Sequence, residues 1–199
     1  IHVSIPLKGS FDEIVDDLKD YFKEEKITLI GFSLGGYIAS YFTCKYPNKV
    51  RKLFLIACSL TALSQEEIDQ RKKAISFTTT LGFKGLSSQK IVSLLDTKNQ
   101  KNIQLIQLIQ QMYIDLGKEV FITQMSVTLN RSDLFDKLSM LNIPMIFFYC
   151  KNDRLINTTW LSDFSKKAKD SIFIENIGTS HMIPLEKPLQ LSNVIKKNI

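Results

Sequence analysis

The sequence has little of the residue types from which metal, redox and disulfide sites are built. Its 199 residues include only two histidines, His2 and His181, and three cysteines, Cys44, Cys58 and Cys150. The cysteines are odd in number, lie among apolar neighbours and form no close pair, a pattern typical of buried free thiols in a reducing compartment. We therefore expect a cytoplasmic protein without a metal ion or another cofactor.

The sequence also lacks long apolar runs and recognisable targeting segments. No run approaches the roughly 18 residues of a membrane span, and no signal peptide is visible, so we expect no membrane-spanning segment. The net charge is +6, but the basic residues are scattered and do not alternate with aromatic ones, which argues against a nucleic-acid partner. Because the sequence begins with Ile1 rather than Met and opens in the middle of a pattern, we expect it to lack an N-terminal piece.

The stretch Ile27–Gly36 carries the most informative motif. It reads as a buried strand, a turn with Ser33 at its apex and a helix that starts near Tyr37. Gly31 and Gly35 complete the pattern G-x-S-x-G, in which a sharp turn presents the serine hydroxyl to solvent. We expect these two glycines to avoid Cβ clashes in the turn, and the helix N-terminus to favour an oxyanion beside the serine. The alternative is an ordinary glycine-containing strand-to-helix turn.

Short strands and amphipathic helices alternate over the first 59 residues. With 44% hydrophobic and 23% charged residues, the chain has the composition of one globular domain. A capping box at Ser10 precedes a helix expected over Phe11–Phe22. Strands are expected at Ile27–Ile30 and Lys52–Ala57, with a helix that ends before Pro47 between them. This order of elements predicts a parallel strand pair.

The segment 60–138 interrupts this alternation because it carries no clear strand. Helices are expected from a capping box at Ser64 to about Ile75, over Asn102–Leu116 and over Lys118–Leu129, with a break at glycines 82 and 85. We therefore divide the chain into a core, residues 1–59 and 139–199, and an inserted helical segment, residues 60–138. Some apolar residues of the insertion either line a pocket or pack against the core: Phe77, Phe83, Met112, Tyr113, Phe121 and Met125.

The strand pattern resumes after the insertion. The apolar run Met145–Cys150 is expected to be a strand covered on both faces, and Ser171–Ile177 the last strand, with a helix over Trp160–Lys169 between them. The loops after these two strands contain Asp153 and His181. A final amphipathic helix carries Leu189, Leu191, Val194 and Ile195 on its apolar face.

Ser33, Asp153 and His181 each follow the carboxyl end of a different strand. In a doubly wound parallel sheet those ends lie along one edge, where active sites form. A serine hydroxyl needs a base within hydrogen-bond reach, and the base needs an orienting acid, so we expect these residues to form a triad. Asp133 and Asp136 are rival acids, but they precede the penultimate strand and fall at its wrong end. The alternatives are a capping role for Asp153 and a structural role for His181.

Four motifs together resemble the α/β-hydrolase fold, in its broad esterase-like group. They span nearly the whole chain and are, in order, Gly31-Phe-Ser-Leu-Gly-Gly-Tyr-Ile-Ala39, Tyr46-Pro-Asn-Lys-Val-Arg-Lys-Leu53, Asn152-Asp153, and Ser180-His-Met-Ile-Pro-Leu-Glu-Lys-Pro188. The resemblance implies a doubly wound, mostly parallel sheet with the helical segment 60–138 as a lid. It further implies Ser33 as nucleophile, His181 as general base and acid, Asp153 as its orienting acid, and the N–H of Leu34 as one oxyanion donor.

The sequence departs from this family pattern in two places. Ser180 stands where the family usually has a glycine before the histidine, which alters the loop without removing chemistry. Nothing before Phe11 resembles the His-Gly loop that supplies the second oxyanion N–H in the family, so we expect an N-terminally incomplete fold. The first strand would then lack a neighbour. Nearby, we expect Glu186 to shape the last loop, and Arg131 with Asp133 either to anchor the insertion or, for Arg131, to contact substrate.

Two hypotheses about function follow. The first is a serine hydrolase that cleaves a small carboxylic ester or related acyl compound through an acyl-enzyme. Thioester, amide and C–C bonds remain open as targets, whereas Ser33 argues against haloalkane dehalogenase and epoxide hydrolase chemistry, for which related enzymes carry aspartate. The second, suggested by the N-terminus, is a non-catalytic ligand-binding or scaffolding protein that keeps the fold. The sequence pattern does not encode the substrate or the oligomeric state.

Overall fold

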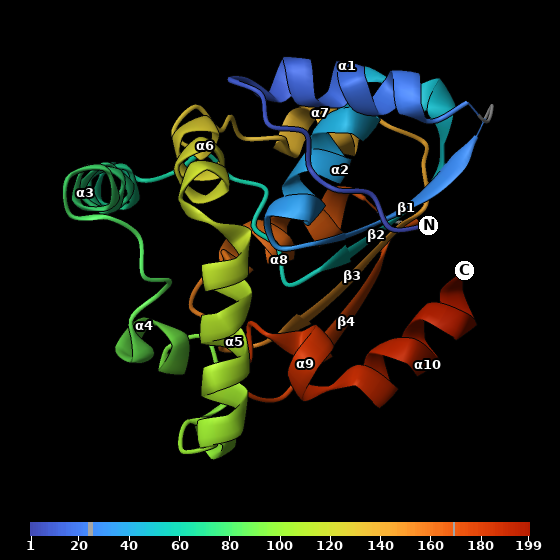
Figure 1. Cartoon of the computed structure of the whole chain (residues 1–199). Coiled ribbons are helices and arrows are strands. Elements are labelled where there is room, and N and C mark those ends of the chain that lie inside the picture. The colour runs from blue at the N-terminus through green and yellow to red at the C-terminus, as the bar shows by residue number, and fades with distance from the viewer. Residues whose placement is uncertain (24–25, 169) are drawn as a thin grey trace.

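Four parallel strands form the centre of the molecule in a computed structural model that describes residues 1–23, 26–168 and 170–199 (Figure 1). The strands lie in the order β1-β2-β3-β4, which is also their order in the sequence. Each pair is parallel, as the alternation of strands and helices predicts. The strands are β1 (Ile27–Phe32), β2 (Val50–Ile56), β3 (Met145–Cys150) and β4 (Ile172–Asn176).

The strand boundaries follow the apolar runs of the sequence closely. β3 has the predicted bounds, and Leu53 of β2 pairs with its first residue, Met145. β1 extends two residues beyond the predicted end at Ile30, and β2 begins at Val50 instead of Lys52. The side chains of the two central strands are almost entirely buried, because helices cover both faces of the sheet.

Helices cover both faces of the sheet in the described part of the chain. α1, α2, α7 and α8 pack over one face, while α9 and α10 lie over the other (Figure 1). A helix layer on each face of a parallel sheet is the doubly wound architecture expected from the sequence. Their bounds are α1 (Phe11–Tyr21), α2 (Leu34–Lys45), α7 (Phe135–Ser139), α8 (Thr158–Lys167), α9 (Ile183–Glu186) and α10 (Pro188–Asn198).

The helix ends correspond to the predicted capping residues. Ser64 forms the predicted capping box with Glu67 in full. At the start of α1 the Ser10 hydroxyl accepts a hydrogen bond from the Glu13 N–H, but the Glu13 carboxylate accepts from the Ser10 hydroxyl, so the predicted box is only half formed. α8 begins two residues before the predicted Trp160. The predicted end of that helix at Lys169 lies outside the described residues.

The described residues of the segment 60–138 form helices and no strand, as predicted. The helices are α3 (Gln65–Leu81), α4 (Ser88–Val92), α5 (Ile103–Leu116), α6 (Lys118–Thr128) and α7, with a short 3₁₀ turn at Thr97–Asn99. A second 3₁₀ turn, Pro47–Lys49, lies outside this segment, between α2 and β2. α3 continues six residues beyond the predicted end at Ile75, and α4 was not predicted. α7 packs on the body of the molecule, since Leu134 and Leu138 belong to the main core.

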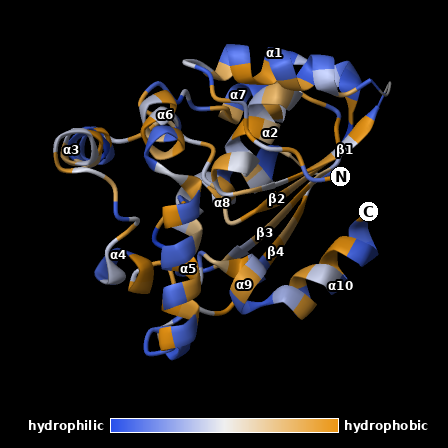
Figure 2. Ribbon diagram, viewed as in Figure 1, coloured by the Kyte–Doolittle hydropathy of each residue, from blue (hydrophilic) through white to orange (hydrophobic). Residues whose placement is uncertain are grey.

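Two groups of buried apolar side chains stabilise the fold. The main core joins the sheet with α1, α2, α7, α8 and α10. The second, smaller cluster joins α4 and α5 to the loop after β4 through Ile91, Leu94, Leu95, Ile109 and Met182. Figure 2 shows the strands as mostly hydrophobic and the helices as mixed along their length, which is the distribution expected when each helix buries one face. Within the described residues, no helix has the length and apolar character needed to cross a bilayer.

Candidate active site

The turn between β1 and α2 presents Ser33 in a strained backbone conformation. Ser33 has φ 51° and ψ −118°, a region that residues with a Cβ rarely adopt. A Cβ on Gly31 would lie 2.5 Å from the Gly35 carbonyl oxygen, and one on Gly36 would lie 2.7 Å from the Cβ of Cys58. Both positions therefore require glycine because the backbone passes too close to its neighbours.

The prediction that Gly35 also avoids a clash is wrong. A Cβ at Gly35 would meet no atom within 4 Å. The second crowded position is instead Gly36, one residue later, where α2 packs against Cys58 at the end of β2. The motif alone could not reveal this contact because Cys58 lies far from Gly36 in the sequence.

Ser33, His181 and Asp153 lie together at the carboxyl edge of the sheet. The Ser33 Oγ is 3.0 Å from Nε2 of His181, and Nδ1 of His181 is 2.7 Å from Oδ2 of Asp153. The side chains of Asp153 and His181 are only 1% and 7% exposed, and the ring of Phe32 packs 5.5 Å from the His181 ring. Three residues from three loops thus form one continuous chain of short polar contacts.

The other candidate acids and the second histidine lie elsewhere. Asp133 accepts hydrogen bonds from the N–H of Phe135 and the indole Nε1 of Trp160. Asp136 is exposed and 3.9 Å from Lys167, and His2 is exposed at the N-terminal end of the chain. The second carboxylate oxygen of Asp153 accepts the N–H of Leu155 at 2.9 Å, so its capping role and its contact with His181 coexist.

The backbone N–H of Leu34 is available beside the Ser33 hydroxyl. Leu34 is the first residue of α2, and Ser33 is its N-cap, so this N–H is one of the first four that have no partner inside the helix. The helix dipole also places partial positive charge there. Among the described residues before Ser33, none lines the adjoining cavity.

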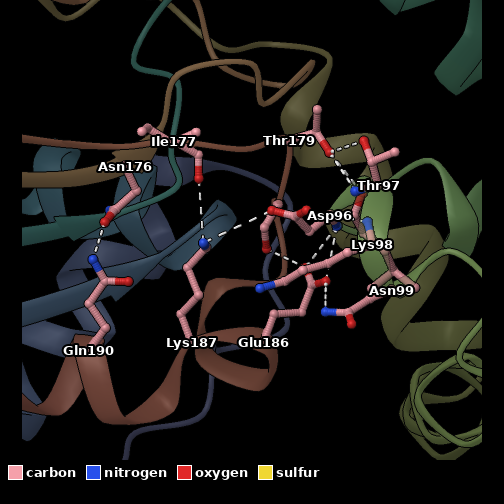
Figure 3. A network of polar contacts seen from close by, with 12 residues as sticks. Asp96, Thr97, Lys98, Asn99, Asn176, Ile177, Thr179, Glu186, Lys187 and Gln190 are labelled. Atoms are coloured by element: carbon pink, nitrogen blue, oxygen red, sulfur yellow. Dashed lines mark hydrogen bonds and ion pairs between the residues drawn. The ribbon is translucent and has the colours of Figure 1, made fainter.

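The segment after α4 holds the loop that contains His181. The carbonyl oxygen of Leu94 accepts hydrogen bonds from the N–H groups of His181 and Met182, at 2.9 and 3.4 Å. Glu186 accepts from the N–H of Asp96 at 2.9 Å and from the side chain of Asn99 at 2.7 Å (Figure 3). These contacts fasten the helical segment to the loop after β4.

Ser180 and Gly178 fit the same network. The Ser180 hydroxyl donates to Glu186, so the residue that replaces the expected glycine finds a buried acceptor. Gly178 has φ 121°, and a Cβ there would lie 2.2 Å from Oδ2 of Asp96. The role predicted for Glu186 in shaping this loop agrees with these contacts. Asp96 and Asn99, which donate to Glu186, were not predicted as its partners. No pattern in the helical segment indicates which of its residues contact the loop after β4.

A cavity of about 500 Å³ opens onto Ser33 and His181. Its lining includes three of the six apolar positions singled out from the sequence, Tyr113, Phe121 and Met125, and also Leu116. Phe77 and Met112 are instead exposed. The walls of the cavity come from α3, α5 and α6 as well as from the loops of the sheet.

Two arginines also line this cavity. Arg131 was expected, with Asp133, to anchor the insertion. Its guanidinium donates to the Ser59 carbonyl and lies 4.3 Å from the centre of the Tyr37 ring. It joins the helical segment to the body by these contacts. Arg71 of α3 was not singled out from the sequence, where it belongs to an apparently solvated run of charges.

All three cysteines are free thiols, as predicted, but only Cys58 and Cys150 are buried and Cys44 is half-buried. Burial raises the pKa of the Cys58 thiol to about 12, so this group beside the turn stays protonated at neutral pH. A protonated thiol is a poor nucleophile. Ser33 is therefore the stronger candidate nucleophile in this part of the molecule.

Comparison with known proteins identifies the family. The sequence matches the alpha/beta hydrolase fold family over residues 8–188. The chain belongs to the alpha/beta hydrolase fold family. No curated protein matches this α/β hydrolase at a significant level.

Many solved structures are similar to this α/β hydrolase. A malate-bound thermophilic esterase from Thermogutta terrifontis is 22% identical, with a TM-score of 0.83 over 98% of this chain and 74% of its own. The enol-lactonase from Burkholderia xenovorans LB400 is 14% identical, with a TM-score of 0.79 over 94% of this chain and 72% of its own. A bromoperoxidase from Bacillus anthracis is 14% identical, with a TM-score of 0.77 over 97% of this chain and 75% of its own. At these identities the likeness shows a common fold, and the proteins named differ in activity.

Proposed function

We propose that this α/β hydrolase is a serine hydrolase that cleaves a small carboxylic ester or a related acyl compound. The observation that carries the proposal is the contact chain from Ser33 Oγ through His181 to Asp153, with distances of 3.0 and 2.7 Å. Both distances lie within hydrogen-bond reach, and each group has the partner that its role requires.

In the proposed reaction, the Ser33 hydroxyl attacks the substrate carbonyl while Nε2 of His181 takes its proton. Asp153 accepts a hydrogen bond from Nδ1–H of His181, which sets the tautomer and stabilises the imidazolium that forms. His181 then returns the proton to the leaving alcohol as the tetrahedral intermediate collapses to the acyl-enzyme. Water attacks this ester in the second half-reaction, again with His181 as base, and releases the acid and free Ser33.

The N–H of Leu34 is the proposed donor to the oxyanion of the tetrahedral intermediate. Its place at the start of α2, directly after Ser33, supports this role because the developing negative charge meets an unpaired N–H and the helix dipole. One such donor is worth about 100- to 1,000-fold in turnover.

We further propose that the helical segment 60–138 acts as the lid of the cavity. α3, α5 and α6 of this segment supply much of the wall that faces Ser33. A wall from a separate group of helices would determine which acyl or alcohol parts fit, while the loops of the sheet carry the chemistry.

A fluorophosphonate probe tests the proposal directly. The probe should label Ser33 in the unmodified chain, and Ser33→Ala should abolish both labelling and hydrolysis of 4-nitrophenyl esters, with a loss in kcat of about 10⁴-fold or more. Ser59→Ala is the matched control, because Ser59 lines the same cavity but its hydroxyl is hydrogen-bonded to that of Thr61 instead of to a histidine. This variant should retain labelling.

His181→Ala separates catalysis from mere binding. If the chain is instead a ligand-binding or scaffolding protein, esters would raise its melting temperature without steady turnover, and His181→Ala would change nothing in the product assay. Labelling that survives in Ser33→Ala would contradict the proposal outright. The hydrogen-bond distance of 3.0 Å between Ser33 and His181 favours the hydrolase over the non-catalytic protein.

A further inference from the structure

The cavity beside Ser33 carries an excess of positive charge. The lining contains three basic side chains, Arg71, Lys90 and Arg131, and one acidic side chain, Glu67. Lys90 is exposed at the rim, whereas both arginines are partly buried. A cavity that served only neutral acyl chains would have no need of two guanidinium groups in its wall, because removing a cation from water is costly without a counter-charge.

Arg71 is held by neutral partners. Its Nη1 donates to the hydroxyl of Thr128 at 2.8 Å and lies 3.8 Å from the sulfur of Met125. The Thr128 hydroxyl in turn donates to the carbonyl of Met125. These contacts fix the direction of the guanidinium without neutralising it. The burial that lowers the pKa of Arg71 is offset only in part by Glu67.

Glu67 is committed to another contact. Its Oε2 accepts hydrogen bonds from the N–H and the hydroxyl of Ser64, as part of the capping box at the start of α3. Among residues 1–23, 26–168 and 170–199, no ion pair involves Arg71 or Arg131. The carboxylate nearest along the helix is thus held at the helix N-terminus. It contributes only a longer-range attraction to Arg71 and Arg131, and within the described residues neither guanidinium has a carboxylate at ion-pair distance.

Arg131 adds a second positive charge in the cavity wall. It is fixed by the Ser59 carbonyl and the Tyr37 ring, and its Nε is buried without a hydrogen-bond partner in the described structure. Burial lowers the pKa of Arg131, and the charge of Arg71 lowers it further, so the two cations are close enough to repel one another. An anion between or beside them would relieve that repulsion.

We propose that the cavity selects esters that carry a carboxylate group, which pairs with Arg71 while Arg131 adds to the positive field. The planar guanidinium matches a carboxylate with two parallel hydrogen bonds. This inference rests on the proposed hydrolase function and names its substrate class. The carboxylate belongs either to the acyl part or to the alcohol part of the ester.

Matched ester pairs test the inference. On the acyl side, mono-4-nitrophenyl glutarate is compared with 4-nitrophenyl valerate; on the alcohol side, 4-carboxyphenyl butyrate is compared with phenyl butyrate. The carboxylate ester of at least one pair should have the higher kcat/KM by about 10- to 100-fold, the range of a charged hydrogen bond. The pair that shows the preference identifies the side of the ester that reaches Arg71. Equal kcat/KM values within both pairs would overturn the inference.

Variants of Arg71 assign the preference to its guanidinium. Arg71→Met should reduce the ratio of the two kcat/KM values to near one, mainly through KM of the anionic ester, and Arg71→Lys should restore part of it. Lys72→Met is the control, since it removes the same charge from an exposed position one residue along α3 and should leave the ratio unchanged. An unchanged ratio in Arg71→Met would contradict the inference.

A binding measurement separates this inference from the proposed catalysis. Ser33→Ala is titrated with monomethyl glutarate and with methyl valerate, and its melting temperature is followed. Stabilisation by the anionic ester alone, lost in Ser33→Ala/Arg71→Met, supports the anion site even if no ester is turned over. The same titration with 4-carboxyphenyl butyrate and phenyl butyrate covers the alcohol side. Equal effects within both pairs would reject the anion site, whatever the outcome of labelling Ser33.

Discussion

At the scale of single residues, the adjacent glycines Gly35 and Gly36 differ in the space available for a Cβ atom. Gly36→Ala would place a Cβ 2.7 Å from Cβ and 2.8 Å from Sγ of Cys58. Because α2 and β2 would have to separate, we expect a loss in stability of about 1–3 kcal/mol and a fall in activity as Ser33 shifts. Gly35→Ala meets no atom and replaces a helical glycine, so it should be neutral or stabilising by up to about 1 kcal/mol.

Thermal unfolding followed by circular dichroism would compare the two glycine variants. The melting temperature of Gly35→Ala should be higher than that of Gly36→Ala. If Gly35→Ala lowered the melting temperature as much as Gly36→Ala, the contact with Cys58 would not explain the loss of stability.

Single residues also mark the limit of prediction from sequence. Ser33, Asp153 and His181 were found because each stands at a recognisable place after a strand, and parallel topology brings such places together. Arg71 and Gly36 act through contacts with residues distant in sequence. The residues next to Arg71 do not show whether its side chain is solvated or lines a cavity. Those next to Gly36 do not show whether another residue could replace it.

At the scale of elements, the junction between the segment after α4 and the loop after β4 depends on Glu186. Its carboxylate accepts from the N–H of Asp96, from Asn99 and from Ser180. Glu186→Ala leaves these donors without their acceptor, so we expect a loss of about 1–3 kcal/mol. For a chain of this size, each kcal/mol corresponds to about 2–4 °C in Tm. We also expect a lower kcat, because the same loop carries His181.

The control for Glu186 is Glu175→Ala on β4. Glu175 is exposed and lies 3.8 Å from Lys151, and exposed ion pairs contribute little to stability. Differential scanning calorimetry together with ester kinetics would separate the two variants. Equal melting temperatures for Glu186→Ala and Glu175→Ala would mean that the junction does not depend on this carboxylate.

The same elements explain which parts of the fold were predictable. β3 and α5 have strong internal patterns, an apolar run in one and amphipathic spacing with a terminal glycine in the other, and their bounds were predicted within one residue. α4 has only five residues, and its place is determined by contacts of Ile91 with α5 and the loop after β4. A helix that owes its position to tertiary packing leaves little signal in a short stretch of sequence.

At the scale of the whole molecule, burial is uneven between the body and the helical segment. α2 contains seven buried residues among twelve, whereas α3, with seventeen residues, buries only Thr78. Local opening is easiest where few apolar contacts must be broken. Amide hydrogens of α3 should therefore exchange faster than those of α2, by roughly 100-fold or more.

Hydrogen exchange followed by mass spectrometry would measure this difference on the intact chain. Peptides from α2 should exchange only when the whole molecule unfolds, and their rates should follow global stability in added denaturant. Equal protection of α2 and α3 would show that the helical segment and the body open as one unit.

The hydrogen bonds from Leu94 have a consequence for the order of events in turnover. Leu94 belongs to the helical segment, and its carbonyl oxygen accepts hydrogen bonds from the backbone N–H of His181, the proposed base, and from that of Met182, the next residue. An outward movement of the segment large enough to admit substrate, if it carries Leu94, breaks both hydrogen bonds and releases that backbone. Entry and proton transfer then occur in sequence, and the base is aligned only after the substrate is enclosed. Turnover could then be no faster than the rate at which the segment closes.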